Sequence, residues 1–337
     1  MRILALQLKR IGDLILTTPA LAAMRAAWPD AHLALAVSEG CAELLPAIPQ
    51  IDTTIVFGRG RGFAPWQQAI TGAWNLCLDF TGNDRSAFAT ALSRAKQRVT
   101  FAWVQRNRMR ALAYSRFVDS QVRDRHTVDH YLDLVRAVTA AAGGSGAPEL
   151  RLPPEAEARS EQMLATAGIC APFALLHPGT ARPEKYWLPE RWAAVADALN
   201  ERRSLASVVT CGPDAFESAH AREIHSALDT RHSALVHPPD LLALAALAAR
   251  AQIVISCDTA IVHLAAAFQT PQIALFGPTN PFHWRPRHGR AVIISAAHPE
   301  APVTDFRPRM KGAPMERIST EVVIRATKLL LAPPLST

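Results

Sequence analysis

The sequence has few cysteines, and no pattern pairs them. Five cysteines, an odd number, are scattered over 337 residues, and no C-x-x-C pair occurs. This excludes a disulfide framework and the common zinc-binding spacings. Three of them, Cys77, Cys211 and Cys257, lie in or beside apolar runs. We therefore predict reduced core cysteines of a cytosolic protein and no metal site.

Long apolar runs are also missing. The longest candidate, 241–249, is stopped by Arg250, far short of the ~18 apolar residues of a membrane span. The apolar run at the N-terminus leads directly into Lys9 and Arg10, unlike a signal peptide. We expect no membrane-spanning helix and no cleaved leader.

Three familiar nucleotide and hydrolase motifs are absent. The chain contains no G-x-G-x-x-G turn after its first strand, no P-loop and no G-x-S-x-G elbow. What it has is 49% hydrophobic and 19% charged residues, which indicates a globular protein with sizeable cores. The net charge of +7 favours anionic ligands such as phosphates, nucleic acid or acidic lipid.

Apolar strand-like runs alternate with Ala- and Leu-rich helical stretches, which predicts parallel sheets covered on both faces. A Gly- and Pro-rich stretch that starts at Ala141 separates two sets, and the last helix follows Ile318, before a frayed tail at 333–337. The expected strands are 3–8, 33–37, 53–57, 75–79 and 98–102, then 173–177, 207–211, 253–256 and 272–276. We predict an α/β protein of two doubly wound, Rossmann-like domains, 1–150 and 151–330, which face a central cleft in the GT-B architecture.

The stretch "ISCDTAIVHLAAAFQTPQIALFGPTNPFHW" carries the strongest signal. Asp258 and Thr259 suit a helix start after a strand, and the helix N-terminus favours an anion. His263 lies one turn further on the same helix face as Thr259. A diphosphate held by backbone N–H groups and a hydroxyl fits this pattern. The alternative is that Asp258 only caps a helix and that His263 is a packed polar residue.

Two further loops follow strands of the second half. In "LLHPGTARPEKYWLPERW", Thr180 opens the loop and Lys185 is placed to reach a phosphate as a mobile charge. In "VVTCGPDAFES", Glu217 is a candidate to bind ribose hydroxyls. Taken alone, a surface lysine and a solvated first-turn carboxylate explain both residues as well.

The first half is basic. Residues 94–125 hold nine Lys and Arg against two Asp and Glu. An anionic acceptor or membrane surface would be drawn there, whereas nucleic acid fits poorly because aromatic residues are sparse among the cations. The alternative is an ordinary solvated surface. The candidate acceptor-binding residues are Arg10, Arg59, Arg61, Arg106, Arg108 and Arg110.

Together these segments resemble the ADP-heptose:lipopolysaccharide heptosyltransferases, glycosyltransferase family 9. The resemblance runs from Met1 to about residue 330 and rests on "KRIGDLILTTPAL", "HTVDHYLDLVRA" and the two loop motifs quoted above. The first two segments look most like the heptosyltransferase III-like branch. Two departures are Ala260, where the family has glycine, and Cys211, where it has the first glycine of a G-G-P turn.

The resemblance implies an inverting, metal-independent transferase with no cofactor, which moves heptose from ADP-L-glycero-D-manno-heptose to a hydroxyl of the lipopolysaccharide inner core. It would work in the cytoplasm, with peripheral contact at the inner membrane. Asp13 matches the proposed general base, and Lys185 the residue that stabilises the leaving group. The donor-binding positions are Thr180, Lys185, Glu217, Asp258, Thr259, Ala260 and His263. A transferase for another nucleotide-sugar or acceptor, a nucleotide-sugar epimerase or phosphorylase, and a non-catalytic nucleotide-binding protein are the alternatives.

Overall fold

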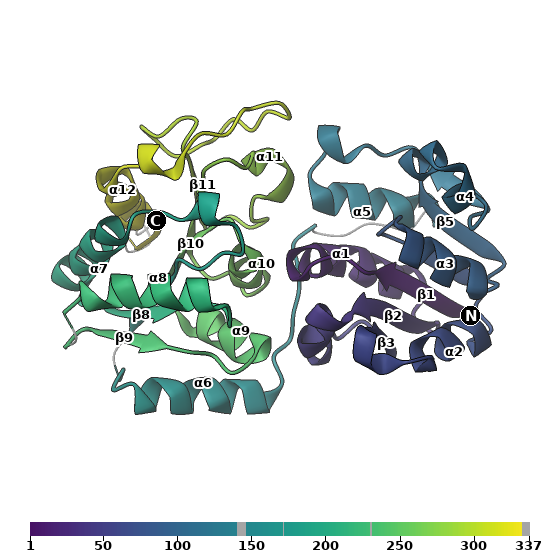
Figure 1. Ribbon diagram of the computed structural model, residues 1–337, viewed down its shortest axis with the longest axis horizontal. Coiled ribbons are helices and arrows are strands. Elements are labelled where there is room, and N and C mark those ends of the chain that lie inside the picture. Colours follow the sequence, from purple (N-terminus) through teal and green to yellow (C-terminus); the bar gives the residue numbers. More distant parts are fainter. Residues whose placement is uncertain (140–145, 171, 230, 332–337) are drawn as a thin grey trace, which may run out of the picture. The chain divides into compact units, whose positions relative to one another are not determined.

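Parallel sheets form the centres of two separate units, Met1–Arg151 and Leu152–Thr337, of this computed structural model. The structure describes residues 1–139, 146–170, 172–229 and 231–331. In both units, helices follow strands and lie on both sides of the sheet (Figure 1). Each unit is therefore a three-layer α/β structure and is described by itself.

Unit 1 contains a six-stranded parallel sheet in the order β3-β2-β1-β4-β5-β6. Helices α1 and α5 pack together, and α3 packs against α2 and α4. The strands are β1 (Arg2–Gln7), β2 (His32–Ser38), β3 (Thr53–Phe57), β4 (Leu76–Asp79), β5 (Gln97–Phe101) and β6 (Arg116–Val118). The helices are α1 (Ile11–Ala27), α2 (Ala64–Thr71), α3 (Asp84–Leu92), α4 (Arg108–Ala111) and α5 (Thr127–Arg136), with 3-10 turns η1 (Glu39–Ala47), η2 (Arg59–Arg61), η3 (Ala102–Arg106) and η4 (Val122–Asp124).

Unit 2 repeats this topology, in the order β12-β11-β10-β7-β8-β9. The strands are β7 (Phe173–His177), β8 (Ala206–Thr210), β9 (Ser233–Val236), β10 (Ile253–Cys257), β11 (Gln272–Phe276) and β12 (Ala291–Ser295). The helices are α6 (Pro154–Thr166), α7 (Pro189–Arg203), α8 (Ala215–Ser226), α9 (Leu241–Arg250), α10 (Ala260–Ala267), α11 (Pro281–Trp284) and α12 (Thr320–Leu331), with 3-10 turns η5 (Pro183–Lys185) and η6 (Met315–Arg317).

The central strands of unit 2 are apolar along their whole length because helices cover both faces. Every residue of β7, β10 and β11 is buried. Trp187 and Trp192 meet edge to face at 5.3 Å in the core beside them, and the Trp187 indole N–H donates to the Ile318 carbonyl at 2.9 Å. This core holds the loop after β7 firmly against the sheet.

The predicted α/β class and the doubly wound units are confirmed, and each of the nine predicted strands is present within one residue at either end. Three strands, β6, β9 and β12, were not predicted. All three lie at sheet edges, and the first two are also short. In the predicted linker, 146–153 forms neither helix nor strand, whereas 141–145 and the tail 333–337 lie outside the described residues. All five cysteines are free thiols, and Cys170 alone among them is exposed.

The strand order locates the functional edge of each sheet. Ligands of open α/β sheets bind beyond the carboxyl ends of the strands, where the strand order reverses. That point lies between β1 and β4 in unit 1, and between β7 and β10 in unit 2. The loops that follow β1, β7 and β10 carry the predicted catalytic and diphosphate-binding residues.

Candidate functional site

The turn between β1 and α1 brings Asp13 to the switch point of unit 1. Asp13 lies in the first turn of α1, where unpaired backbone N–H groups favour a carboxylate. Its Oδ1 accepts a hydrogen bond of 2.7 Å from the hydroxyl of Tyr131 on α5. The side chain is half-buried. A fixed carboxylate thus stands at the carboxyl edge of the sheet.

The predicted acceptor-binding arginines lie on loops at the same edge of the sheet. Arg10 directly precedes α1 and is exposed. Arg59 and Arg61 form η2, which follows β3, and Arg106 ends η3, which follows β5. Arg108 begins α4 and is exposed. Parallel strands bring these loops to one edge, although they are far apart in the chain.

Arg110 differs from the other cations of this region. Its guanidinium forms two hydrogen bonds with the Asp84 carboxylate, at 2.5 and 3.0 Å. A bidentate pair of this kind fixes both side chains. The charge of Arg110 is therefore largely balanced within the fold, whereas Arg106 and Arg108 are exposed.

In unit 2, Lys185 and Asp258 form an ion pair across the switch point. Lys185 ends the 3-10 turn after β7, and Asp258 is the first residue after β10. The Lys185 Nζ donates to Asp258 Oδ2 at 2.6 Å and to the Asp258 carbonyl at 3.0 Å. Both side chains are buried. Lys185 is thus a buried, anchored cation, which differs both from the mobile charge predicted to reach a phosphate and from the alternative of a surface lysine.

The helix α10 begins directly behind this ion pair. Thr259 is its N-cap in an extended conformation, and its side chain makes no capping hydrogen bond. Among the described residues, the buried Oγ1 atoms of Thr259 and Thr279 have no hydrogen-bond partner. Ala260 is the first helical residue, so its backbone does not require glycine. His263 is buried one turn further along. The unpartnered Thr259 hydroxyl and the first N–H groups of α10 thus lie together at this helix start.

Glu217, on α8, contacts both the loop that follows β7 and the loop that follows β8. Its Oε2 accepts a hydrogen bond of 2.9 Å from the Gly212 N–H. A Cβ added to Gly179 or Gly212 would lie 2.5 or 2.6 Å from the same oxygen, so only glycine permits this approach. Burial raises the pKa of the Glu217 carboxyl. Glu217 is buried, so it is not the solvated first-turn carboxylate that was the alternative for this residue. Thr180 is also buried, and its hydroxyl accepts a hydrogen bond of 3.3 Å from the Arg182 N–H.

His177, the last residue of β7, lies beneath this loop. Its Nδ1 is 3.0 Å from Thr210 Oγ1, and burial lowers its pKa to about 4. A buried neutral histidine makes folding sensitive to acid, because the unfolded state binds a proton before the folded state does.

Stability is therefore expected to fall as the pH drops from about 6.5 toward 4. The pKa of His177 is lower in the folded state than in the unfolded state, so protonation of the unfolded chain costs no stability above about pH 6.5. At pH 5 it lowers the free energy of unfolding by about 2 kcal/mol. Urea unfolding of the parent protein and of His177→Gln, at pH 7 and pH 5, measures this. An equally steep acid dependence in the variant would show that His177 contributes none of it.

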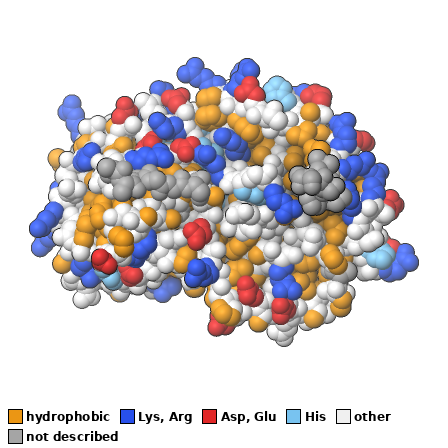
Figure 2. Space-filling model, turned by 180° about the vertical axis from the view of Figure 1, so that it is seen from behind, with side chains coloured by type: hydrophobic (Ala, Val, Ile, Leu, Met, Phe, Trp, Pro, Cys, Tyr) orange, Lys and Arg blue, Asp and Glu red, His pale blue; other side chains and the backbone are white. Residues whose placement is uncertain are grey.

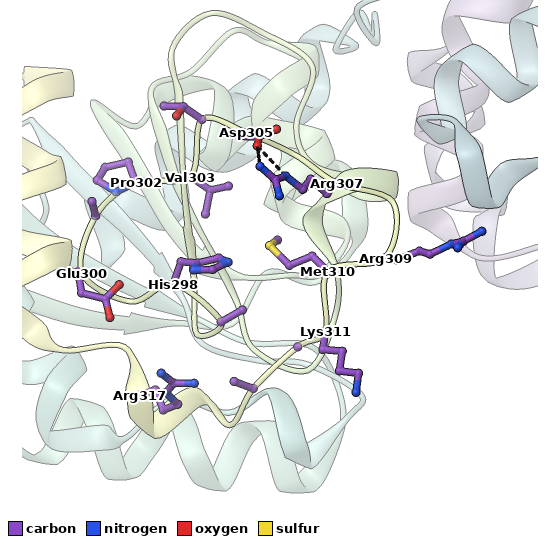
Figure 3. Close-up of a pocket in the computed structure, with 15 residues that line it drawn as sticks. His298, Glu300, Pro302, Val303, Asp305, Arg307, Arg309, Met310, Lys311 and Arg317 are labelled. Carbon is purple, nitrogen blue, oxygen red and sulfur yellow. Dashed lines mark hydrogen bonds and ion pairs between the residues drawn. The ribbon is translucent and has the colours of Figure 1, made fainter.

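A hollow of about 830 Å³ lies within the loop that follows β12. Its lining includes His298, Val303 and Met310, and Arg307 there pairs with Asp305 at 2.8 Å (Figure 3). None of the predicted site residues lines it. Gly312 of this loop packs against Pro278, at the end of β11, so closely that a Cβ would fall 2.2 Å from the Pro278 carbonyl oxygen. The hollow thus adjoins the β11 loop but is separate from the ion pair.

In the described ranges, no three His, Cys, Asp or Glu residues are grouped so that they could hold a metal ion. No helix in the same ranges has the length and apolar character needed to cross a membrane. Lys and Arg side chains are spread over the face drawn in Figure 2.

Sequence reasoning missed the partners of the two central groups. Tyr131 had been noted only as part of the segment "HTVDHYLDLVRA", and its bond to Asp13 spans 118 positions. Likewise, the pairing of Lys185 with Asp258 joins residues 73 positions apart. The only signal available was that both partners lie in segments with recognisable motifs.

Comparison with known proteins agrees with these observations. The family model "Glycosyltransferase family 9 (heptosyltransferase)" matches residues 64–313. Lipopolysaccharide heptosyltransferase 3 of Escherichia coli is 25% identical over 331 residues, which cover 95% of this chain and 96% of the relative.

Solved structures show the same fold over nearly the whole chain. A glycosyltransferase family 9 protein from Veillonella parvula superimposes with a TM-score of 0.85, at 22% identity, and covers 98% of this chain and 97% of its own. The E. coli heptosyltransferase WaaC with ADP-2-deoxy-2-fluoro heptose gives a TM-score of 0.73, at 20% identity, over 98% and 99% of the two chains. The two doubly wound units are thus those of a GT-B glycosyltransferase, and the chain belongs to glycosyltransferase family 9, the heptosyltransferases.

Proposed function

We propose that this glycosyltransferase moves heptose from ADP-L-glycero-D-manno-heptose to a hydroxyl of the lipopolysaccharide inner core, with inversion at the anomeric carbon. Unit 1 would bind the acceptor and unit 2 the nucleotide-sugar. The observation that carries the proposal is the ion pair of Lys185 and Asp258 in front of α10, which prepares a diphosphate site at the switch point of unit 2. The names of the heptosyltransferase relatives and the ADP-sugar bound to WaaC support the choice of donor.

The donor diphosphate would meet three kinds of hydrogen-bond donor. The ammonium of Lys185 has three N–H groups, of which Asp258 takes two, so one remains for a phosphate oxygen. The buried hydroxyls of Thr259 and Thr279, unpartnered among the described residues, would donate further bonds. The first N–H groups of α10 favour the same negative charge. Glu217 would bind the ribose hydroxyls.

The reaction would be a single displacement. The acceptor hydroxyl loses its proton to Asp13 while its oxygen forms a bond to the anomeric carbon of the heptose. The bond from that carbon to the β-phosphate oxygen breaks, and ADP leaves with the bonding electron pair. Lys185 and the start of α10 stabilise the charge that develops on ADP.

An acceptor-dependence assay tests the proposal against its alternatives. ADP-heptose is mixed with the protein and with truncated lipopolysaccharides, and ADP release and the product anomer are followed. We expect ADP release only when an acceptor is present, and a product of opposite anomeric configuration to the donor. Sugar interconversion without acceptor would instead indicate an epimerase, and a retained configuration would exclude single displacement.

Unit 1 is further proposed to contact the inner membrane through the surface around α4. Met109 and Leu112 are 79% and 78% exposed, and the exposed Arg106 and Arg108 directly precede them in the chain. Apolar side chains between cations suit an interface of anionic headgroups and acyl chains. The cations of this surface and of η2 would also attract an anionic glycolipid acceptor.

Sedimentation with vesicles tests this contact. At low salt, the parent protein should bind phosphatidylglycerol vesicles much more strongly than phosphatidylcholine vesicles. Because each cation near the surface contributes about 1 kcal/mol, the double change of Arg106 and Arg108 to Gln should weaken binding roughly tenfold or more. Changing Met109 and Leu112 to Ser should weaken it as well, whereas Leu329→Ser, an exposed leucine of unit 2, should not. Equal loss in Leu329→Ser would contradict a localised surface.

A further inference from the structure

Tyr131 is a buried residue of α5 to which the proposed reaction gives no part. Its ring is 1% exposed and meets Phe80 edge to face at 5.6 Å. The hydroxyl at the end of this buried ring donates to Asp13 Oδ1 at 2.7 Å. The packing of α5 against α1 thus delivers one phenol to the carboxylate at the switch point.

The phenol remains a donor throughout the working pH range. Burial first, and then the charge of Asp13, raises the pKa of Tyr131 well above 10. A protonated phenol has one proton to give, and here it points at Oδ1. The other carboxylate oxygen, Oδ2, is left to accept a proton from elsewhere.

Lys9 adds a positive charge to the same cluster. Its Nζ lies 3.5 Å from the Tyr131 hydroxyl oxygen and 5.5 Å from the centre of the ring. A cation on the phenol oxygen strengthens the hydrogen bond that this phenol donates. Lys9, Tyr131 and Asp13 therefore form a chain of polar groups that ends at the carboxylate.

We propose that Tyr131 is a positioning residue of the transfer reaction: it holds Asp13 Oδ1 so that Oδ2 faces the acceptor hydroxyl. This inference rests on the proposed role of Asp13 as general base. The helix α5 would then contribute to catalysis through the Tyr131 hydroxyl, and not only to the core through its ring.

A second buried tyrosine provides a matched control. The Tyr114 hydroxyl donates to Asp79 Oδ2 at 2.5 Å, in the same unit and also in the interior. Asp79 is fully buried and also accepts from the Thr81 and Gly82 N–H groups. Tyr114→Phe thus removes the same type of bond without touching Asp13, and it measures what a purely structural tyrosine–aspartate pair contributes.

The test compares Tyr131→Phe with Tyr114→Phe. Acceptor-dependent ADP release from ADP-heptose is measured between pH 5 and 9, with melting temperatures for each protein. For Tyr131→Phe we expect kcat to fall about tenfold, because the carboxylate that has lost this hydrogen bond no longer holds its other oxygen toward the acceptor hydroxyl. The KM for ADP-heptose should not change. Tyr114→Phe should lose stability only and keep the parental kcat.

Two results would overturn the inference. One is a Tyr131→Phe protein that is folded and has the parental kcat. The other is an equal loss of kcat in Tyr114→Phe. The Asp13→Asn variant distinguishes failure of this inference from failure of the proposed function. If Asp13→Asn is active, Asp13 is not the general base. If Asp13→Asn is inactive and Tyr131→Phe is unaffected, only the role of Tyr131 is wrong.

Discussion

Asp13→Asn is expected to lower kcat by about 100-fold or more, because removal of a general base forfeits that factor at least. Asparagine has the same shape as aspartate, and its Oδ1 can still accept the hydrogen bond from Tyr131. The packing of α1 against α5 should therefore survive. What is lost is the ability to take a proton from the acceptor hydroxyl.

Donor binding should be unaffected by this change. Asp13 belongs to unit 1, and the proposed diphosphate site is built from unit 2. Calorimetric titration with ADP should give the same affinity for the variant as for the parent. Asp30→Asn, which alters an exposed aspartate of the same unit, serves as the control and should keep full activity. Turnover near the parental rate at saturating donor would remove Asp13 from the mechanism.

The strands that form the centres of the sheets could be predicted from the sequence, because burial on both faces makes them uninterrupted apolar runs. β7 and β11 were predicted with their observed bounds. Edge strands carry a weaker signal. β6 is three residues long and begins with the exposed Arg116, so it cannot be distinguished from the basic loop around it. Its position depends on pairing with β5, which only the folded chain supplies.

The candidate site was predictable residue by residue but not pair by pair. A helix start after a strand is a local pattern, and the sequence indicated one at Asp258 and Thr259. The first helix was expected only behind Thr18, whereas α1 begins at Ile11 and carries Asp13 in its first turn. The direction of a long side chain from a neighbouring loop is set by packing. Lys185 could be expected near a phosphate, but its anchoring by Asp258 follows from the adjacent positions of β7 and β10.

Lys185→Met is expected to weaken ADP binding about 10- to 100-fold and to lower stability. The binding loss follows from one charge-assisted hydrogen bond, worth about 1.5–3 kcal/mol, where about 1.4 kcal/mol is a factor of ten. The stability loss has a separate cause. Without its partner, the buried Asp258 carboxylate is left uncompensated, which costs about 3–5 kcal/mol.

A double change separates these two effects. When Asp258→Asn is added to Lys185→Met, the uncompensated charge disappears, and the melting temperature should recover much of its loss. ADP affinity should not recover, because the ammonium that would bind the diphosphate is still missing. Lys328→Met, an exposed lysine of α12, is the matched control and should change neither quantity. Parental ADP affinity in the folded double variant would show that Lys185 only holds Asp258 in place, and the diphosphate would then depend on the start of α10 and its hydroxyls alone.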